Sequence, residues 1–229
     1  MRFILLLFLF LTPILTHAKT DNLYTIAKRQ GLVIYQTNPY TFYCHIPFDH
    51  HGRVQVTGGS YLTDKNSRIQ WEHIVPVRRF AHEMSCWKQP LCIDKKGHPF
   101  KGRRCCHLIN DTFQKMEADL HNLVPVLPKI NQARSYFDFQ ENIVGDQPLP
   151  HCDLKVNKKN HIVSPPPSTR GFIARAYLYM HQTYGISLTE AELQQFHRWN
   201  LENPPDAWER QRHQKILEKQ GTTNPFITD

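Results

Sequence analysis

The stretch Ile69-Gln70-Trp71-Glu72-His73-Ile74-Val75-Pro76 decides the fold of this chain. It predicts a short extended segment closed by its proline, followed by a helix over residues 76–87 with the proline in the first turn. An ionisable pair, Glu72 and His73, therefore lies at the end of a strand and just before a helix. Adjacent residues of a regular strand point to opposite faces. If both act in one site, we expect the turn that follows to rotate one of them.

A second polar cluster is Met116-Glu117-Ala118-Asp119-Leu120-His121-Asn122-Leu123-Val124-Pro125. Apolar residues at helical spacing predict a helix over residues 110–123, which a proline then ends. On that helix Glu117 and His121 are four residues apart and share a face. Asn131 follows in the next segment. Carboxylate and amide oxygens suit a hard cation that keeps several waters, such as Mg²⁺.

The residues alone leave simpler interpretations open. His73 is compatible with a structural histidine, and Glu72 with a surface carboxylate. Asn131 is compatible with an asparagine that caps a turn. Glu117 is equally compatible with a surface ion pair to His121.

The remainder of the chain predicts a single α+β domain that is mostly helical, with short antiparallel strands. Helices are expected over residues 21–34, 171–184, 191–200 and 204–220, and strands over residues 40–46 and 53–57. Thr189 and Glu192 have the spacing of a capping box at the start of one of these helices. Turn residues lie at 58–59 and 64–66, and irregular segments are expected over 88–107 and 144–167.

The N-terminus has the pattern of a secretory signal peptide. Arg2 is followed by an apolar run and then by small residues near Ala18. We therefore expect a signal peptide over residues 1–18 and the mature domain over residues 19–229. An uncleaved membrane anchor is the alternative, but the run is short for a bilayer span and Pro13 interrupts it.

Charge and cysteine content add two constraints. The formal net charge is +8 at pH 7 and the pI is about 9.2, so the protein attracts polyanions such as nucleic acid. Six cysteines in an exported chain favour disulfides. The alternative is a zinc site, which would be built from Cys86, Cys92, Cys105, Cys106 and His107.

Four segments together resemble one known family. They are Trp71-Glu72-His73-Ile74-Val75-Pro76, a cysteine-bearing basic loop after Cys86-Trp87, Met116 to Pro125 with Asn131 downstream, and Arg170-Gly171-Phe172-Ile173-Ala174-Arg175-Ala176-Tyr177-Leu178-Tyr179-Met180. In this order they resemble the bacterial endonuclease I family, whose members are periplasmic or secreted nonspecific nucleases. The resemblance implies the fold of that family, with a ββα-metal, or His-Me finger, core.

The resemblance also implies a role for each site residue. His73 matches the general base that takes a proton from the attacking water. Glu72 and Asn131 match the two protein ligands of a single Mg²⁺ ion, for which Mn²⁺ and Ca²⁺ are candidate substitutes. Arg103 matches the arginine that holds the phosphate, although the adjacent Arg104 and a longer preceding loop leave this choice open. Glu117 matches an acidic residue beside the site that orients its neighbours.

The remaining positive charge and the cysteines give two further expectations. We expect Arg78, Arg104 and Arg175 to bind phosphates around the scissile one. The favoured pairings are Cys44–Cys152, Cys86–Cys106 and Cys92–Cys105, among the many that six cysteines permit. The chain departs from the family in having Ile46 where a cysteine is common, and in carrying Cys92 and Cys105 in the basic loop.

The expected function is therefore sequence-nonspecific, metal-dependent hydrolysis of DNA to 5′-phosphate ends, with RNA as a second candidate substrate. We expect an exported monomer, periplasmic or secreted, with no stable membrane association. One alternative is an exported nucleic-acid-binding protein without catalysis. A zinc peptidase is disfavoured because His82-Glu83 is not followed by the second histidine of an H-E-x-x-H motif. Because four cysteines surround Arg103, we also expect the reduced protein to have low activity.

Overall fold

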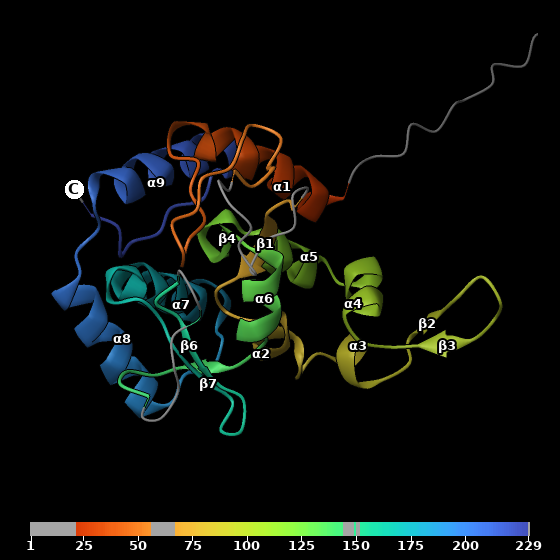
Figure 1. The fold of residues 1–229 in the computed structure, drawn as a ribbon. Helices are drawn as coiled ribbons and strands as arrows, with labels where there is room; N and C mark the ends of the chain where they lie inside the picture. The colour runs from red at the N-terminus through yellow and green to blue at the C-terminus, as the bar shows by residue number, and fades with distance from the viewer. Residues whose placement is uncertain (1–21, 56–66, 144–148, 150–151, 229) are drawn as a thin grey trace, which may run out of the picture.

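The computed structural model describes residues 22–55, 67–143, 149 and 152–228. The expected signal peptide, the turns at 58–59 and 64–66 and the end of the predicted strand 53–57 lie outside the described residues. The described part combines helices with short strands in small sheets, which confirms the α+β class (Figure 1).

A two-stranded antiparallel ribbon lies at the centre of the fold. Strand β1 (Gln70–His73) pairs with β4 (Leu123–Val126), and Glu72 lies opposite Val124. Strand β1 and the helix-initiating Pro76 confirm the prediction for this segment. Helix α6 (Pro128–Arg134) follows β4 directly and returns to contact β1. These elements form a β–β–α unit of the kind that the family resemblance implies.

Strand β4 replaces the end of a predicted helix. Helix α5 (Asp111–Ala118) ends earlier than expected, and a 3-10 turn (Leu120–Asn122) leads into β4. Asp119 explains the early end, because its side chain accepts a hydrogen bond from the backbone of His121. The same carboxylate accepts hydrogen bonds from the hydroxyls of Tyr179 and Tyr184. The prediction of helix through Leu123 was therefore wrong.

Three helices form the C-terminal part, as predicted. They are α7 (Arg170–Tyr184), α8 (Glu190–Glu202) and α9 (Ala207–Gln220), and α7 packs closely against α8. The capping box of Thr189 and Glu192 is present at the start of α8. Gly221 ends α9 with a φ of 70°, a left-handed conformation that favours glycine.

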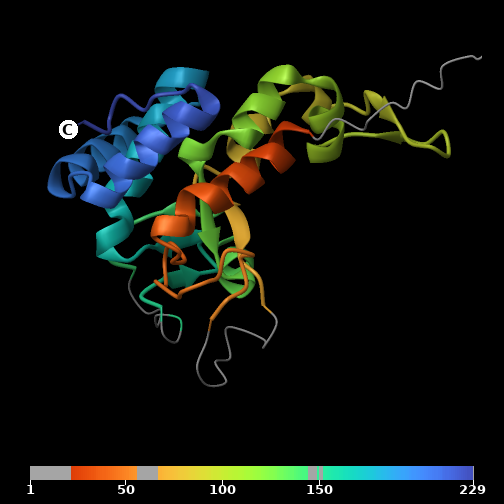
Figure 2. The same ribbon diagram turned by 90° about the horizontal axis from the view of Figure 1, so that it is seen from above.

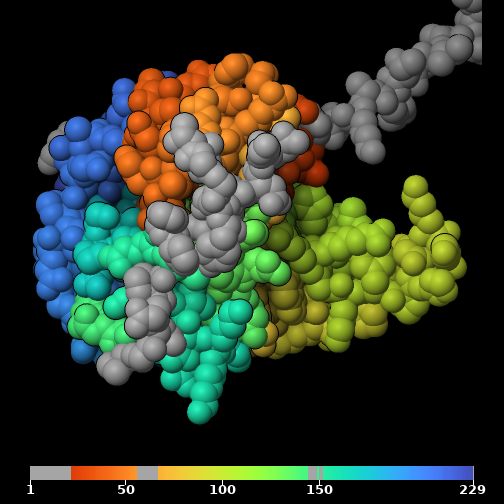
Figure 3. All heavy atoms as spheres, viewed as in Figure 1, coloured from red at the N-terminus to blue at the C-terminus, as the bar shows by residue number. Residues whose placement is uncertain are grey.

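A cross-linked arm (residues 85–109) projects from the body of the molecule (Figures 2 and 3). The predicted helix over residues 76–87 is broken into α2 (Val77–Ala81) and α3 (Ser85–Lys88). The predicted irregular loop contains a hairpin of β2 (Cys92–Ile93) and β3 (Pro99–Phe100), followed by α4 (Arg103–Ile109). Asp94 shapes the hairpin turn by accepting hydrogen bonds from the backbone of Lys96 and His98.

Two further strand predictions also differ from the structure. Residues 40–46 form a turn in which Thr41 and Ile46 bond to each other, and His45 has a φ of 49°. Arg53 and Val54 make isolated bridges rather than a strand. A small sheet was missed, in which β7 (Ile162–Ser164) lies between β5 (Asp138–Phe139) and β6 (Lys155–Asn157).

Helix α1 (Leu23–Ile34) lies close to β1, as Figure 2 shows. Asn22 caps this predicted helix. Gly31 is required at the contact, because a Cβ atom there would collide with the ring of Trp71. Among the described residues, no helix is both long and apolar enough to span a membrane.

Candidate catalytic site

His73 lies at the end of β1 with its ring held from two sides. Its Nε2 atom is 2.8 Å from the main-chain oxygen of Glu117, and the ring of Tyr24 stacks on it at 5.5 Å between centroids. Because a carbonyl oxygen only accepts, Nε2 carries the hydrogen and Nδ1 carries the lone pair. The Nδ1 atom makes no hydrogen bond to a described residue. The ring is thus oriented with a basic nitrogen available.

The electrostatics keep this ring neutral. The pKa of His73 is lowered from its ordinary value to about 4, first by burial and then by the positive charge of Arg103. The carbonyl and carboxylate of Glu117 oppose the shift, and the charge of Arg134 adds to it. At neutral pH the imidazole is therefore unprotonated and able to accept a proton.

Glu117 organises the side chains around His73. It is only 2% exposed on α5, and its carboxylate accepts from Arg103 Nε at 2.7 Å and contacts His107 Nδ1 at 2.5 Å. The alternative pair with His121 does not form. His121 lies beyond the end of α5, where its Nε2 is 3.3 Å from the main-chain oxygen of Thr222. This outcome fits the expected role of Glu117 as an orienting residue.

The two neighbouring arginines of α4 point in different directions. Arg103 bonds to Glu117 and lies over the ring of Tyr24 at 5.5 Å, and its side chain is 46% exposed. Arg104 instead lies over the ring of Phe100 at 4.6 Å. Arg103 is therefore the arginine placed beside His73, in keeping with the sequence-based choice.

Glu72 is buried in a different set of contacts. Tyr43 donates its hydroxyl to Oε1 at 2.8 Å, and Arg134 Nε forms an ion pair with the same oxygen at 3.1 Å. Burial raises the pKa of Glu72 to about 7, although Arg134 and Tyr43 oppose the shift. The other oxygen, Oε2, is buried and has no hydrogen-bond partner among the described residues. A buried carboxylate oxygen without a partner is costly, and a cation would compensate it.

Asn131 lies on the face of α6 that contacts β1. Its Nδ2 donates to Gln70 Oε1 at 3.0 Å, and Gln70 shares a strand face with Glu72. Arg134, one turn after Asn131, reaches Glu72 itself. Asn131 and Glu72 therefore lie on the two elements of one contact, that of α6 with β1. This donor set fits a hard cation that keeps several waters.

Within the described residues, no larger donor set competes with this one. No cluster of three or more His, Cys, Asp or Glu side chains among the described residues could hold a metal ion. All six cysteines are disulfide-bonded, so the zinc alternative is wrong. The pairs are Cys44–Cys152, Cys86–Cys106 and Cys92–Cys105, which confirms the favoured pairings.

Glu72 and His73 point to opposite faces of the ribbon, because the pairing of β1 with β4 stays regular through His73. The turn at Val75 and Pro76 does not rotate either side chain, which corrects our expectation. The two faces still interact, since the charge of Arg134 on the Glu72 side contributes to the pKa of His73. Within the described residues β1 pairs with β4 alone, which leaves its other edge without a strand partner.

The expectation that Arg175 binds phosphate is wrong. It is buried on α7, and its guanidinium forms two bonds with the carboxylate of Glu209. It also donates to the side chain of Asn200 and to the main-chain oxygen of Asn203. All of this occurs in the helical C-terminal part, so Arg175 stabilises helix packing. Arg78 and Arg104 remain exposed and available to phosphate.

Sequence reasoning missed several residues that shape the site. The ring of Tyr24 stacks on His73, and His107 contacts Glu117. Tyr43 and Arg134 contact Glu72. Arg134 had a usable signal, because it lies three residues after Asn131 and thus on the same helix face. The others come from distant segments and had no local signal.

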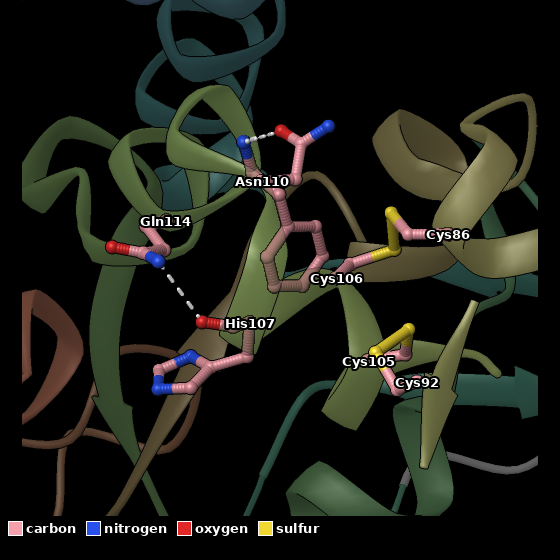
Figure 4. The surroundings of a disulfide bond; sticks show 8 residues. Cys86, Cys92, Cys105, Cys106, His107, Asn110 and Gln114 are labelled. Atoms are coloured by element: carbon pink, nitrogen blue, oxygen red, sulfur yellow. Dashed lines mark hydrogen bonds between the residues drawn. A yellow bond between two sulfur atoms is a disulfide. The ribbon is translucent and has the colours of Figure 1, made fainter. Parts of the chain in front are cut away.

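Two disulfides fix the helix that carries Arg103 and His107. Figure 4 shows Cys86–Cys106 and Cys92–Cys105 side by side, with His107 next in the chain after Cys106. Gln114 of α5 also donates to the main-chain oxygen of His107 at 3.0 Å. The position of α4 against α5 therefore depends on cross-links as well as packing.

Comparison with known proteins supports the family resemblance seen in the sequence. Residues 12–229 match the family described as Endonuclease I. An extracellular deoxyribonuclease of Aeromonas hydrophila is 36% identical over 220 residues, which is 92% of this chain and 90% of the relative. A periplasmic deoxyribonuclease of the same species is 36% identical over 210 residues, covering 88% of this chain and 84% of the relative.

A third relative comes from a different genus. Endonuclease-1 of Buchnera aphidicola subsp. Acyrthosiphon pisum is 34% identical over 214 residues, covering 90% of this chain and 80% of the relative. The extracellular and periplasmic relatives and the three disulfides agree with the expectation from the sequence that the protein is exported. By sequence over nearly its whole length, and with the expected β–β–α unit in place, this chain belongs to the endonuclease I family.

Proposed function

We propose that this protein is a magnesium-dependent endonuclease that hydrolyses DNA without sequence specificity. The observation that carries the proposal is the arrangement of His73, whose Nε2 is held by a carbonyl while Nδ1 remains available. A neutral imidazole held in this way is suited to activate water. The relatives include proteins named deoxyribonuclease and endonuclease, which supports DNA as the substrate.

In the proposed reaction, Nδ1 of His73 takes a proton from the attacking water. Arg103, oriented by Glu117, contacts the phosphate and stabilises the charge that develops on it. Glu72 and Asn131 would hold one Mg²⁺ ion, and the ion would supply positive charge next to the leaving 3′ oxygen. Water attack on phosphorus with loss of that oxygen gives a 5′-phosphate end and a 3′-hydroxyl end. In this proposal His73 and Glu72 act on the phosphate from opposite faces of β1.

The groups assigned to the substrate explain why cutting would be nonspecific. Arg78, Arg103 and Arg104 are exposed cations suited to phosphate, and contacts to phosphate carry no base information. RNA has the same phosphodiester linkage and remains a second candidate substrate. We expect activity to fall steeply with added salt, since binding releases counterions from the nucleic acid.

The central test is the variant His73→Ala, with His197→Ala as the matched control. His197 is an exposed histidine on α8. Removing the base should lower the rate of plasmid cleavage by about 10²- to 10⁴-fold while DNA binding and thermal stability stay close to those of the parent. The control should retain full activity. Unchanged cleavage in His73→Ala would refute the catalytic assignment, and absence of cleavage in the parent would favour a binding protein.

The metal is tested separately. Chelation should abolish cleavage, and adding back Mg²⁺ should restore it. Glu72→Gln should raise the Mg²⁺ concentration needed for half-maximal activity, because an amide binds the ion more weakly than a carboxylate. The exposed Glu218 on α9 supplies the control variant Glu218→Gln, which should leave that concentration unchanged. Full activity after chelation would rule out the metal-dependent mechanism.

A further inference from the structure

A cavity of about 640 Å³ lies next to the candidate site; it includes none of the catalytic or metal-ligand candidates and shares only Arg78 with the proposed phosphate contacts. It is bordered by α2, α5, the segment after α6 and the segment after α7. Phe80 separates it from the site, since its ring lines the cavity and lies 6.1 Å from the ring of His73. Met116 lines it as well and directly precedes Glu117. A single side chain, that of Phe80, therefore lies between the cavity and the proposed general base.

The walls of the cavity are mainly apolar and aromatic. They include Phe80, Met116, Tyr136, Tyr184, Ile186 and Leu188. Thr112 and Ser187 add hydroxyl groups. A flat heteroaromatic group with a few polar edge atoms fits such a lining, and the volume lies within the range of sites for small ligands.

A cation and an aromatic ring lie together on the lining. The guanidinium of Arg78 lies 4.8 Å from the ring centroid of Tyr136, which is 43% exposed. Arg78 forms no ion pair with a described residue.

The acidic groups of the lining have cationic partners. Asp138 pairs with Arg79 at 3.1 Å, and Glu83 pairs with Lys88 and contacts His82. Arg79 is also bonded to Glu192 at 2.6 Å, so its single charge serves two carboxylates. Arg78 forms no ion pair with a described residue and is the cation that can meet a phosphate of a ligand.

We infer that the cavity binds an unpaired nucleobase of the substrate, next to the scissile phosphate, with the base on Tyr136 and a phosphate at Arg78. The inference rests on the proposed function, because the ligand is taken to be a nucleotide of the substrate that His73 acts on. Bases stack on aromatic side chains with little regard for sequence. A base paired within a duplex would first have to leave the stack, which costs free energy. The cavity therefore favours single-stranded or frayed substrate over intact duplex.

The test measures binding in the His73→Ala background, so that it does not depend on cleavage. Tyr136→Ala should weaken the affinity for a short single-stranded oligonucleotide about 5- to 100-fold, the effect of losing one base–aromatic stack, and the affinity for a blunt duplex by less than about twofold. Tyr40, an exposed tyrosine stacked on His45 outside this cavity, gives the control Tyr40→Ala. The control should change neither affinity.

A fluorescent base analogue reports on stacking itself. Because cutting has no fixed position, the probe is a short oligonucleotide with 2-aminopurine at every position. Its fluorescence should be quenched on binding when Tyr136 is present, and not with Tyr136→Leu, which keeps an apolar side chain should the alanine variant fail to fold. Abasic nucleotides in place of the bases should remove the difference between the Tyr136 variant and its parent. Equal weakening of single strand and duplex, or no weakening at all, would overturn the inference while leaving the catalytic tests of His73 unaffected.

Discussion

Strand β1 and helix α4 both carry residues of the candidate site, but different forces hold them in place. Glu72 and His73 on β1 are 3% and 6% exposed and are surrounded by core side chains. The cross-linked arm that includes α4 exposes large apolar residues, among them Ile93 at 71%. Two disulfides, Cys86–Cys106 and Cys92–Cys105, tie the arm together. Burial positions the base, and covalent cross-links position the arginine.

The comparison shows why an exported enzyme can build part of its site on so small an element. A short segment cannot bury enough apolar surface to fix its own conformation, and disulfides restrict its unfolded states instead. Glu117 joins the two regions, because its main-chain oxygen holds His73 while its carboxylate holds Arg103 and His107. Perturbing burial and perturbing the cross-links should therefore have separable consequences.

The largest effect on stability is expected from Arg134→Met, in the buried region. Removing this guanidinium leaves the carboxylate of Glu72 buried without its ion-pair partner, which should cost about 3–5 kcal/mol of the free energy of unfolding. Denaturant titration of the oxidised protein measures the loss. Adding Glu72→Gln to the variant should recover part of it. The control is Arg198→Ala, whose half-exposed ion pair with Glu141 should cost about 1 kcal/mol or less. Equal losses in Arg134→Met and Arg198→Ala would show that the buried ion pair contributes no more stability than the half-exposed one.

In the arm, the expected effect is on activity at smaller cost to the fold. Replacing Cys92 and Cys105 by serine opens a cross-link that spans 13 residues, worth about 3 kcal/mol at most. We expect turnover to fall because α4 no longer fixes Arg103, while the near-ultraviolet circular dichroism of the core is retained. Replacing Cys44 and Cys152 by serine is the control, since that disulfide lies outside the arm. The control should lower stability but keep the turnover of the folded enzyme. Full turnover with the arm disulfide absent would contradict this assignment.

Glu117→Gln tests the link between the two regions. The main-chain contact to His73 is unaffected, whereas charge-assisted bonds to Arg103 and His107 are weakened. We expect a fall in kcat of about 10- to 100-fold, corresponding to the strength of a hydrogen bond to a charged group. The acid limb of the pH–activity profile should move to lower pH, because the lost carboxylate charge of Glu117 had raised the pKa of His73. A loss as large as that of His73→Ala would indicate that Glu117 acts on the substrate directly.

The sequence predicted the elements whose signals are local. The capping box of α8, the glycine that ends α9 and the proline after β1 each act within a few residues, and each was found. Strand β4 was missed because its apolar run is compatible with helix or strand, and only pairing with β1, far away in the chain, decides between them.

The same distinction holds within the site. Glu72, His73 and Asn131 stand in local motifs and could be proposed from sequence. The burial of Arg175 against Glu209 depends on how α7 packs on α9, so a buried structural arginine was taken for a surface cation. The choice between Arg103 and Arg104 likewise required the position of Glu117.

Acid should act on the buried region in a graded way, through His121. Burial, reinforced by the charge of Arg212, lowers the pKa of His121 to about 3, whereas the unfolded chain has the ordinary value of about 6.5. The folded state therefore binds fewer protons than the unfolded state between these values, so stability rises with pH across this window. The part of the stability that comes from neutral His121 should be fully present above pH 6.5. It should be lost progressively below that pH, by at most about 1.4 kcal/mol for each pH unit.

Comparing His121→Gln with its parent at pH 7.5 and pH 5.5 isolates this contribution. Asp119, whose carboxyl pKa is raised by burial, is present in both proteins and so cancels in the difference. The parent should lose more stability than His121→Gln on acidification, and the exposed-histidine control His197→Ala should behave like the parent. Identical losses in His121→Gln and its parent would mean that His121 takes up its proton without disturbing the fold. In that case acid would not separate the buried region from the arm, and reductant alone would distinguish them.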